Sequence, residues 1–242
     1  MLKDFEDAYG YEIYDHFMGK HTFEIIERED GFIDLSSGPV MYFQTYDDWS
    51  NHNKQAMEFV SGRVLDIGCG AGRFSLYLQG KGHPVLGIDN SPKAVEVCLL
   101  RGLKEVKGIP ITRISASLGK FDTILMLGNN FGLMCNPTRA KWLLRRFRQI
   151  TNENAVIIAE SNDIYQTTEP LHLEYHAYNR QRGRLSGQIR LRVRHKKRAT
   201  PWFDYLMVSK LEMEDILDGT GWQVKEFIDS DTSSYIAIIG KT

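Results

Sequence analysis

Residues 63–72 read Arg-Val-Leu-Asp-Ile-Gly-Cys-Gly-Ala-Gly, and a second apolar run, Val85-Leu86-Gly87-Ile88-Asp89, follows shortly after them. Each run is short and apolar, which is typical of a strand buried on both faces. Three glycines at alternate positions end the first run. They allow a sharp turn into the helix predicted over 73–80 and let a ligand approach the main chain. The first turn of that helix offers unpaired N–H groups, and Asp89 is placed to accept hydrogen bonds from two ribose hydroxyls. The two runs therefore predict a site for a nucleoside cofactor.

The glycine spacing and a nearby carboxylate distinguish between nucleoside cofactors. The glycines are Gly68, Gly70 and Gly72, whereas a dinucleotide fingerprint needs a glycine three positions after its second one, where Arg73 stands. Asp66 would repel a pyrophosphate but suits a ligand that carries an ammonium or a sulfonium group. S-adenosylmethionine carries both groups and an adenosine. A nicotinamide oxidoreductase is therefore disfavoured, and the full signature of a Walker-type phosphate loop does not occur.

Two motifs carry a family resemblance. The stretch Val64 to Gly72 resembles the first motif of the class I S-adenosylmethionine-dependent methyltransferases, and Gly87-Ile88-Asp89-Asn90-Ser91 resembles their second. The resemblance covers about residues 60–162 and, in pattern, the last thirty residues. It implies an α/β fold, with a Rossmann-like, doubly wound, seven-stranded sheet whose last strand is antiparallel. It also implies S-adenosyl-L-methionine as cofactor and S-adenosyl-L-homocysteine as product.

The resemblance also implies roles for single residues. Gly68 and Gly70 would approach the methionyl part of the cofactor, and Asp66 would lie near its ammonium group. Asp89 would hold the ribose, and Asn90 would lie against the adenine. The full set of expected cofactor-binding residues is Asp66, Gly68, Cys69, Gly70, Gly72, Asp89, Asn90 and Gly128.

Two positions need separate comment. Cys69 lies inside the glycine loop, and we interpret it as a small filler residue and not as a nucleophile. Many family members carry an acid after the third strand that touches the adenine amino group. This chain has Lys107-Gly108-Ile109-Pro110-Ile111-Thr112 there. Adenine recognition is therefore expected to depend on backbone groups and apolar contacts.

Composition sets bounds on the class of protein. The chain has 242 residues, is 42% hydrophobic and 25% charged, and has a net charge of −1, which predicts one globular domain without global steering toward nucleic acid or membrane. No apolar run approaches membrane-spanning length, and the acidic N-terminus lacks a secretion core. Three scattered cysteines predict neither a disulfide framework nor a zinc site. We expect a cytoplasmic protein, monomeric or homodimeric, with no metal and no membrane partner.

The order of the predicted elements indicates the architecture. Strands and helices alternate through the centre of the chain, which favours a parallel sheet. We expect an N-terminal lid segment over 1–45 and a methyltransferase domain over 46–242. A small antiparallel insertion on the substrate side is expected at about 163–205. Strands are predicted at about 63–68, 85–89, 104–107, 121–127, 155–160, 222–229 and 234–240, and helices at about 12–18, 47–60, 72–81, 91–101, 137–150 and 211–217. A hairpin is expected within 22–33, with its turn at Glu29-Asp30-Gly31. Asp47 or Asp48 could cap the helix that runs to about Val60, and Ser91 followed by Pro92 is a typical start for the helix at 91–101.

One predicted strand of the insertion is strongly basic. Gln188 to Arg194 alternates strictly, and no acid occurs from Tyr175 through Phe203. A functional interpretation is a surface for an anionic substrate, phosphate or RNA over about 188–198. We favour a solvated strand face that pairs with acidic N-terminal residues or with a second subunit.

Methyl transfer from a sulfonium requires an aligned lone pair and the exclusion of water, so a catalytic triad is not needed. A loop after the predicted strand 121–127 should border the reacting methyl, and Asn129 or Asn130 could orient an acceptor there or cap the next turn. After the strand at 155–160, Tyr175 and His176 are candidate substrate residues. The catalytic residue is unknown, with Asn129, Asn130 and His176 as weak candidates, and Asn130, Tyr175 and His176 as weak substrate candidates. His172 and His176 are four residues apart, but the His-Glu-x-x-His pattern is absent, so no metal is predicted.

Four aromatic residues precede the first motif. Tyr42, Phe43, Tyr46 and Trp49 either close over the cofactor as a lid or pack the N-terminal segment on the core. The sequence leaves both interpretations open.

The function predicted from these patterns is methyl transfer to an N or O atom of an unidentified small molecule by in-line displacement. The alternatives are an RNA or protein methyltransferase that uses the basic strand, and a non-catalytic protein that binds S-adenosylmethionine. Neither the acceptor nor the oligomeric state follows from the sequence.

Overall fold

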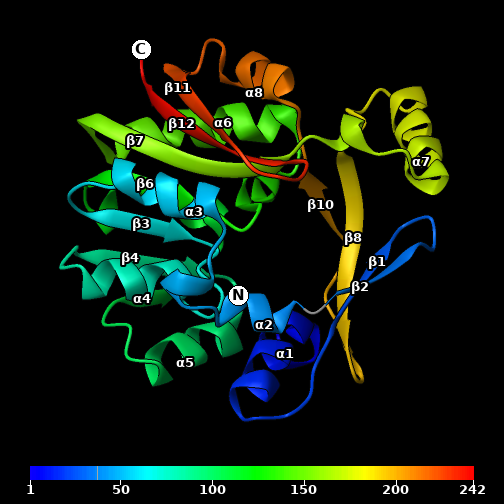
Figure 1. Ribbon diagram of the computed structural model, residues 1–242, viewed down its shortest axis with the longest axis horizontal. Helices are drawn as coiled ribbons and strands as arrows, with labels where there is room; N and C mark the ends of the chain where they lie inside the picture. Colours follow the sequence, from blue (N-terminus) through cyan, green and yellow to red (C-terminus); the bar gives the residue numbers. More distant parts are fainter. Residues whose placement is uncertain (37) are drawn as a thin grey trace. The chain divides into compact units, whose positions relative to one another are not determined.

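The computed structural model describes residues 1–36 and 38–242. Seven strands form a sheet in the order β11-β12-β7-β6-β3-β4-β5 (Figure 1). Their bounds are β3 Val64–Ile67, β4 Val85–Asp89, β5 Val106–Gly108, β6 Phe121–Met126, β7 Thr151–Asn162, β11 Trp222–Asp229 and β12 Ser234–Lys241. The pairs β3–β4, β4–β5 and β6–β7 are parallel, whereas β12 is antiparallel to both β7 and β11. The predicted α/β fold, with seven strands and an antiparallel last strand, is confirmed.

Helices connect these strands and precede them. Their bounds are α1 Ala8–Phe17, α2 Pro39–Tyr42, α3 Asn51–Ala56, α4 Arg73–Gly80, α5 Pro92–Leu100, α6 Pro137–Gln149, α7 Pro170–Gln181 and α8 Lys210–Leu217. Ser91 caps α5 as the sequence predicts, because its hydroxyl accepts the Ala94 N–H at 3.0 Å and Pro92 occupies the first helical position. In the part of the chain that the structure describes, every helix is too short or too polar to span a bilayer.

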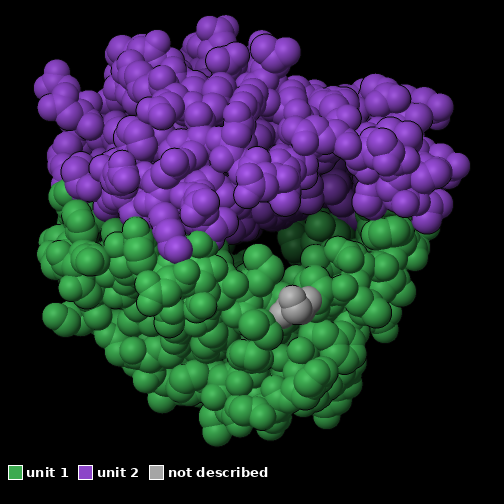
Figure 2. Space-filling model, viewed as in Figure 1, with its two compact units in different colours: residues 1–49, 62–114, 191–203 green, residues 50–61, 115–190, 204–242 purple. Residues whose placement is uncertain are grey.

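The chain divides into two compact units, which Figure 2 colours separately. Unit 1 comprises residues 1–49, 62–114 and 191–203, and unit 2 comprises residues 50–61, 115–190 and 204–242. The expected division into a lid over 1–45 and a domain over 46–242 remains a prediction.

Unit 1 contains strands β3, β4 and β5 with helices packed on them. Helices α4 and α5 contact β4, and α1 of the N-terminal segment packs on α5. Ile13 of α1 is fully buried with Ala71, Ala94 and Val97. The N-terminal segment is thus joined to the helix that follows the second motif by a common apolar cluster.

Unit 2 contains the strands β6, β7, β11 and β12. Residues 235–239 of β12 are all at most 2% exposed, so both faces of this strand are covered. Helix α8 packs on β11 and on α6, and α3 packs on β12 and β11. Trp222 begins β11 and donates from its indole N–H to the Leu144 carbonyl of α6 at 2.9 Å, which fastens this strand to that helix.

A second, antiparallel sheet of five strands in the described residues contains the strands of the expected antiparallel insertion and, in addition, the hairpin of the N-terminal segment. Its order is β10-β8-β1-β2, with β9 paired to β8. The bounds are β1 Glu24–Arg28, β2 Ile33–Ser36, β8 Gln188–His195, β9 Arg198–Ala199 and β10 Phe203–Leu206. The β1–β2 hairpin turns at the predicted Glu29-Asp30-Gly31, but its pairing with β8 joins segments that are more than 160 residues apart in the chain. Local patterns do not encode such a partner.

The basic strand is neutralised by acids of the N-terminal segment, as the favoured interpretation predicts. Arg192 donates to both carboxylate oxygens of Glu27 at 2.9 Å, and Arg194 donates to the same carboxylate at 3.0 Å. Arg198 donates to Asp4 at 3.1 Å. The positive charges of Arg192, Arg194 and Arg198 are therefore paired with acids of the same chain.

Smaller differences concern the ends of elements. The helix predicted from Asp47 or Asp48 begins later, at Asn51, because residues 46–48 form a separate turn of 3-10 helix and Ser50 occupies the N-cap. Strand β7 is longer than predicted, since its first residue, Thr151, already pairs with Phe121. Helix α7 was not predicted.

Asp15 of α1 joins two lysines and a histidine in unit 1. It is 5% exposed and accepts from Lys20 at 2.6 Å, from His195 at 2.9 Å and from Lys196. Burial alone would raise the pKa of Asp15, but the hydrogen bonds from Lys196, Lys20 and His195 outweigh this and hold it well below its usual value.

We expect Asp15→Asn to lower the free energy of unfolding by about 1–2 kcal/mol at pH 7, because the exposed Lys20 and Lys196 lose a carboxylate partner and the buried His195 keeps only an amide oxygen. The folded-state pKa is depressed, so this stabilisation is present above the unfolded-state pKa near 3.9 and is lost as the pH falls toward the folded-state value. Urea unfolding of both proteins between pH 7 and pH 2 measures this. The control is Asp231→Asn at an exposed acid. If the difference in unfolding free energy between the wild type and Asp15→Asn stays constant below pH 4, the prediction is contradicted.

Candidate functional site

The glycine loop after β3 lies in unit 1 and depends on left-handed backbone conformations. Gly70 has φ +54° and Gly72 has φ +81°, which side chains other than glycine rarely adopt. A Cβ atom at Gly70 would lie 3.0 Å from the Tyr9 hydroxyl, and one at Gly72 would lie 3.3 Å from Cys98 Sγ. The loop is therefore restricted to glycine both by its backbone and by its neighbours.

Asp89 at the end of β4 is hydrogen-bonded to this loop. Its Oδ2 atom accepts the Gly70 N–H at 3.0 Å, and its Oδ1 atom accepts the Ser91 N–H at 2.9 Å. Burial raises the pKa of Asp89 to about 6, although the backbone bonds from Ser91 and Gly70 act against this shift. A carboxylate oxygen offers about two acceptor sites, so each has a site left for a hydroxyl donor. The arrangement can bind a vicinal diol.

Asp66 lies on β3 and is 3% exposed. The Ser75 hydroxyl of α4 donates to its Oδ2 atom at 2.6 Å. Burial raises the pKa of Asp66 to about 6, with a smaller upward contribution from Asp89 and an opposing one from Ser75. A buried carboxyl with one hydroxyl partner favours a cationic neighbour. Ser75 was missed by the sequence analysis, and its only signal is a polar residue at a buried position of the helix.

Cys69 packs in the manner expected of a filler residue. It is 7% exposed, its Sγ lies 3.9 Å from Cys98 Sγ, and it would lie 3.0 Å from a Cβ atom at Gly87. The contact with Cys98 and then burial raise the pKa of the Cys69 thiol well above its usual value. A thiol that stays protonated is a poor nucleophile.

The remaining cofactor candidates of unit 1 lie beyond the two motifs. Asn90 is exposed, and its carbonyl accepts the Leu2 N–H at 3.0 Å. In the segment 107–112, Gly108 ends β5, and a Cβ atom there would lie 2.2 Å from Met1 Sδ. The first two residues of the chain therefore pack beside Asn90 and beside Gly108. Their expected contacts with adenine remain predictions.

Unit 2 contributes a buried acid with three partners. Glu160 of β7 accepts the Gly128 N–H at 2.7 Å and the Ser234 hydroxyl at 2.9 Å, and its Oε1 atom lies 3.7 Å from His52 Nε2. Burial alone would raise the pKa of Glu160, but the contacts with His52, Gly128 and Ser234 outweigh it and lower the value. The acid therefore stays ionised and fixes the loop that begins at Gly128. His52, on α3, has no motif around it and could not be found from the sequence.

The asparagines after β6 differ in their surroundings. Asn129 has φ +65°, and its carbonyl accepts the Tyr205 hydroxyl. It stands at the N-cap of the short helix 130–134, but its side chain makes no capping hydrogen bond, so the capping interpretation fails for this residue. Its Oδ1 atom is buried and has no hydrogen-bond partner among the described residues. Asn130 is the first residue of that short helix.

Tyr175 and His176 lie on α7 and are buried, with 2% and 8% exposure. The Tyr175 hydroxyl accepts the Arg190 N–H at 3.1 Å, which ties α7 to β8. The His176 ring lies 6.2 Å from the ring of Tyr165. A substrate role for either residue remains a prediction. Residue 37 aside, no three His, Cys, Asp or Glu side chains are grouped as a metal site would require.

The four aromatic residues before the first motif pack inside unit 1. Trp49 is 4% exposed and meets Phe74 edge to face at 4.7 Å. Tyr46 stacks on Tyr77 at 4.7 Å. Phe43 stacks on Phe17 of α1, and the Tyr42 hydroxyl donates to Glu24. These contacts support the packing interpretation.

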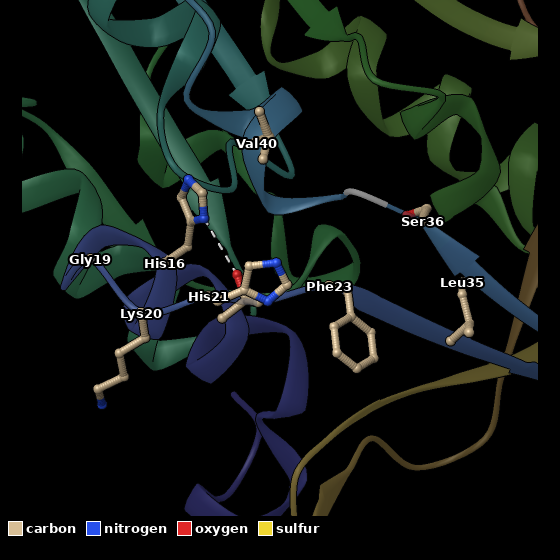
Figure 3. A pocket seen from close by; sticks show the side chains of 9 residues that line it. His16, Gly19, Lys20, His21, Phe23, Leu35, Ser36 and Val40 are labelled. Atoms are coloured by element: carbon tan, nitrogen blue, oxygen red, sulfur yellow. Dashed lines mark hydrogen bonds between the residues drawn. The ribbon is translucent and has the colours of Figure 1, made fainter.

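An open cleft of about 800 Å³ lies within the N-terminal segment of unit 1 (Figure 3). Its lining includes the side chains of His16, His21, Phe23, Leu35, Ser36 and Val40, and the His16 ring is 3.3 Å from the Thr22 hydroxyl. Both apolar and polar groups are therefore available to a ligand.

A comparison of the chain with known protein families agrees with this geometry. Residues 64–154, which contain β3, the glycine loop and Asp89, match the family model described as a methyltransferase domain. The matched segment is thus similar to a methyltransferase domain, and it makes up less than half of the chain.

A curated relative is similar to part of the chain. A stretch of 79 residues is 34% identical to the 2-heptyl-1-hydroxyquinolin-4(1H)-one methyltransferase of Mycobacteroides abscessus. It is 33% of this chain and 33% of the relative, so only about a third of the curated relative's length is matched.

Solved structures match over a larger part of the chain. The S-adenosylmethionine-dependent methyltransferase from Bacteroides fragilis in complex with S-adenosyl-L-homocysteine has a TM-score of 0.85 at 24% identity, covering 100% of this chain and 98% of that one. A methyltransferase from Methanosarcina mazei has a TM-score of 0.59 at 17% identity, covering 76% and 95%. These likenesses show that the chain has the same fold as the compared proteins.

Replacing Gly70 tests whether the loop is restricted in two ways. We expect Gly70→Ala to lower the free energy of unfolding by about 1–2 kcal/mol for the left-handed conformation, and further because its methyl group meets the Tyr9 hydroxyl. Gly82→Ala, at φ +93° with no atom within 4 Å of the added Cβ, is the matched control. Thermal unfolding of Gly70→Ala and Gly82→Ala, each with and without Tyr9→Phe, measures both contributions. If Tyr9→Phe restores stability to neither glycine variant, the close contact with the Tyr9 hydroxyl does not restrict Gly70.

Proposed function

We propose that this protein is a class I S-adenosylmethionine-dependent methyltransferase, which moves a methyl group from S-adenosylmethionine to an N or O atom of a small molecule. The observation that carries the proposal is the linkage of Asp89 to Gly70 across β3 and β4 in unit 1. It combines a buried carboxylate, whose oxygens still have acceptor sites, with a loop open to close backbone approach. A nucleoside with two ribose hydroxyls fits this donor and acceptor set.

The proposed cofactor residues take separate roles. Asp89 accepts the ribose hydroxyls, and Asp66 attracts the ammonium group of the methionyl part. Gly68 and Gly70 allow close approach of that part, and Gly72 begins α4. The remaining proposed residues are Cys69 as filler, Asn90 beside the adenine, and Gly128, whose N–H is held by Glu160.

When bound, S-adenosylmethionine supplies a methyl group on a positively charged sulfur, which departs as the neutral thioether of S-adenosylhomocysteine. The chain has to align the acceptor lone pair with the S–CH₃ bond and keep water away. A neutral amine acceptor needs no base at that moment, whereas a hydroxyl acceptor must lose its proton. Asn129, with its unpartnered buried Oδ1, Asn130 and His176 are the proposed orienting candidates.

A small-molecule acceptor agrees with two findings. The curated relative from Mycobacteroides abscessus is named for a hydroxyquinolone, which is a small molecule. In addition, Arg192, Arg194 and Arg198 of the basic segment 188–198 are engaged by Glu27 and Asp4 of the same chain. We also propose a cytoplasmic location, because the scattered cysteines of the sequence do not predict a disulfide framework.

Calorimetric titration with S-adenosylmethionine, S-adenosylhomocysteine and NADH tests the cofactor. We expect binding of the first two and no signal with NADH. Asp89→Ala should weaken binding by roughly 30-fold, because loss of charged hydrogen bonds to the ribose costs about 2 kcal/mol. Asp231→Ala, at an exposed acid remote from both motifs in sequence, should bind as the wild type does.

Three outcomes separate the alternatives. Binding of neither sulfur cofactor, after mass spectrometry has excluded a copurified ligand, would overturn the proposal. Binding without transfer to any acceptor, and without slow hydrolysis of S-adenosylmethionine, would favour a non-catalytic binding protein. NADH binding that Asp89→Ala removes would favour the oxidoreductase.

The neutralised basic strand makes a separate prediction about RNA. We expect no binding of single-stranded or hairpin RNA at 50 mM salt in fluorescence anisotropy, because the Arg192 and Arg194 guanidinium groups are already held by Glu27. Glu27→Gln, which frees positive charge, serves as the comparison and should increase RNA binding. Wild-type binding that falls steeply with salt would instead favour the RNA methyltransferase.

A further inference from the structure

Glu12 of α1 is a buried acid without a partner. It is 0% exposed, and neither of its carboxylate oxygens has a hydrogen-bond partner among the described residues. Burying a polar group without a hydrogen bond is costly, and such groups are rare in folded proteins. Its presence inside unit 1 therefore requires an explanation.

A second buried acid lies close to it. Glu24 of β1 is 7% exposed, and it accepts the Tyr42 hydroxyl at 3.0 Å and the Ser36 hydroxyl at 3.1 Å. Burial and then repulsion from Glu24 raise the pKa of Glu12 to about 9, and burial also raises the pKa of Glu24. Neither acid forms a salt bridge in residues 1–36 and 38–242. The pair lacks the positive charge that would normally accompany it.

Two tyrosines connect this pair to the glycine loop. The rings of Tyr9 and Tyr42 meet edge to face at 5.5 Å, and a Cβ atom at Gly70 would lie 3.0 Å from the Tyr9 hydroxyl. Burial raises the pKa of Tyr9, with further contributions from Tyr42, Asp89, Glu24 and Glu12. Glu24, the two aromatic rings and the glycine loop are thus linked by successive contacts, and Glu12 follows Tyr9 by one turn of α1. Carboxylates and aromatic faces together are the groups that bind organic cations.

The cleft of Figure 3 adjoins Glu24 through Ser36, and the two acids themselves are not among the residues that line it. Ser36 lines the cleft and donates to Glu24, and His16, one turn after Glu12 on α1, lines it as well. Phe23 and Leu35 offer apolar surface to the rest of a ligand. The charge of Lys20, which also lines the cleft, is compensated by Asp15 at 2.6 Å.

We propose that Glu12 and Glu24 bind the ammonium group of an organic amine. The inference rests on the proposed methyl transfer for the ligand's identity, since such a reaction brings two ammonium sources to unit 1. One is an amine acceptor with an apolar body, and the other is the amino group of the cofactor. Asp66 is already proposed for the cofactor amino group, and the cleft has room for an acceptor, so the acceptor is the occupant that the geometry favours.

Calorimetric titration with benzylammonium chloride tests the site directly, and benzyl alcohol serves as the neutral counterpart. The wild type should bind the cation and not the alcohol, and Glu12→Gln and Glu24→Gln should each weaken this binding at least tenfold. Glu214→Gln, at an exposed acid of α8, is the control and should leave it unchanged. Thermal unfolding verifies that the variants fold, and Glu12→Gln should be at least as stable as the wild type, because an amide replaces an unpaired carboxyl.

Titrations of the same variants with S-adenosylmethionine and S-adenosylhomocysteine identify the source of the ammonium group. Weakened benzylammonium binding with unchanged cofactor binding supports an amine acceptor, and weakened binding of both cofactors supports the cofactor's amino group. If the folded variants bind all of these ligands as the wild type does, or if the wild type binds the alcohol as well as the cation, the inference is overturned. Failure of the proposed function is distinguishable, because it appears as loss of cofactor binding in the wild type itself.

Discussion

The parallel register of β3 and β4 is the constraint on which the candidate site depends. Ile67 pairs with Ile88, and the Ile88 carbonyl accepts the N–H groups of both Gly68 and Cys69. That pairing holds the first turn of the glycine loop beside the end of β4, where Asp89 accepts the Gly70 N–H. A shift of one residue would turn Asp89 to the opposite face of the sheet and remove its contact with the loop. Strand pairing, loop conformation and carboxylate position therefore form one hydrogen-bonded unit.

The buried acids of this chain differ in the number of donors around them, and their protonation follows from that number. Glu160 has three partners and a lowered pKa, so it is a fixed structural anion that holds the Gly128 loop. Asp66 and Asp89 have fewer donors than their burial requires, and the pKa of each is raised to about 6. Glu12 has no donor among the described residues, and its pKa is raised to about 9. A deficit of donors is the property that a ligand-binding acid needs, because the ligand supplies the missing hydrogen bond or charge.

The basic strand β8 illustrates how tertiary pairing changes the meaning of a charge pattern. Alternating arginines in a segment without acids resemble a surface for nucleic acid when the sequence alone is considered. In the structure, Glu27 of β1 accepts from both Arg192 and Arg194, because β1 and β8 are neighbours in the antiparallel sheet. The hairpin that supplies this glutamate precedes the strand by more than 160 residues. The N-terminal segment is thus an electrostatic partner of β8, in addition to packing on α5 through α1.

The sequence by itself determined the fold class, the order of most strands and helices, and the residues of the two cofactor motifs. These features depend on local physics: apolar runs, glycines that reach positive φ, Ser91 before Pro92, and the Asp30-Gly31 turn. Tertiary structure alone decided that Glu27 neutralises the basic strand, that Ser75 binds Asp66, and that His52 approaches Glu160. It also decided that Glu12 is left without a partner beside Glu24. These pairs join residues that are distant in the chain or that lie on one helix face without a motif, and only burial in the folded protein gives their charges a strong interaction.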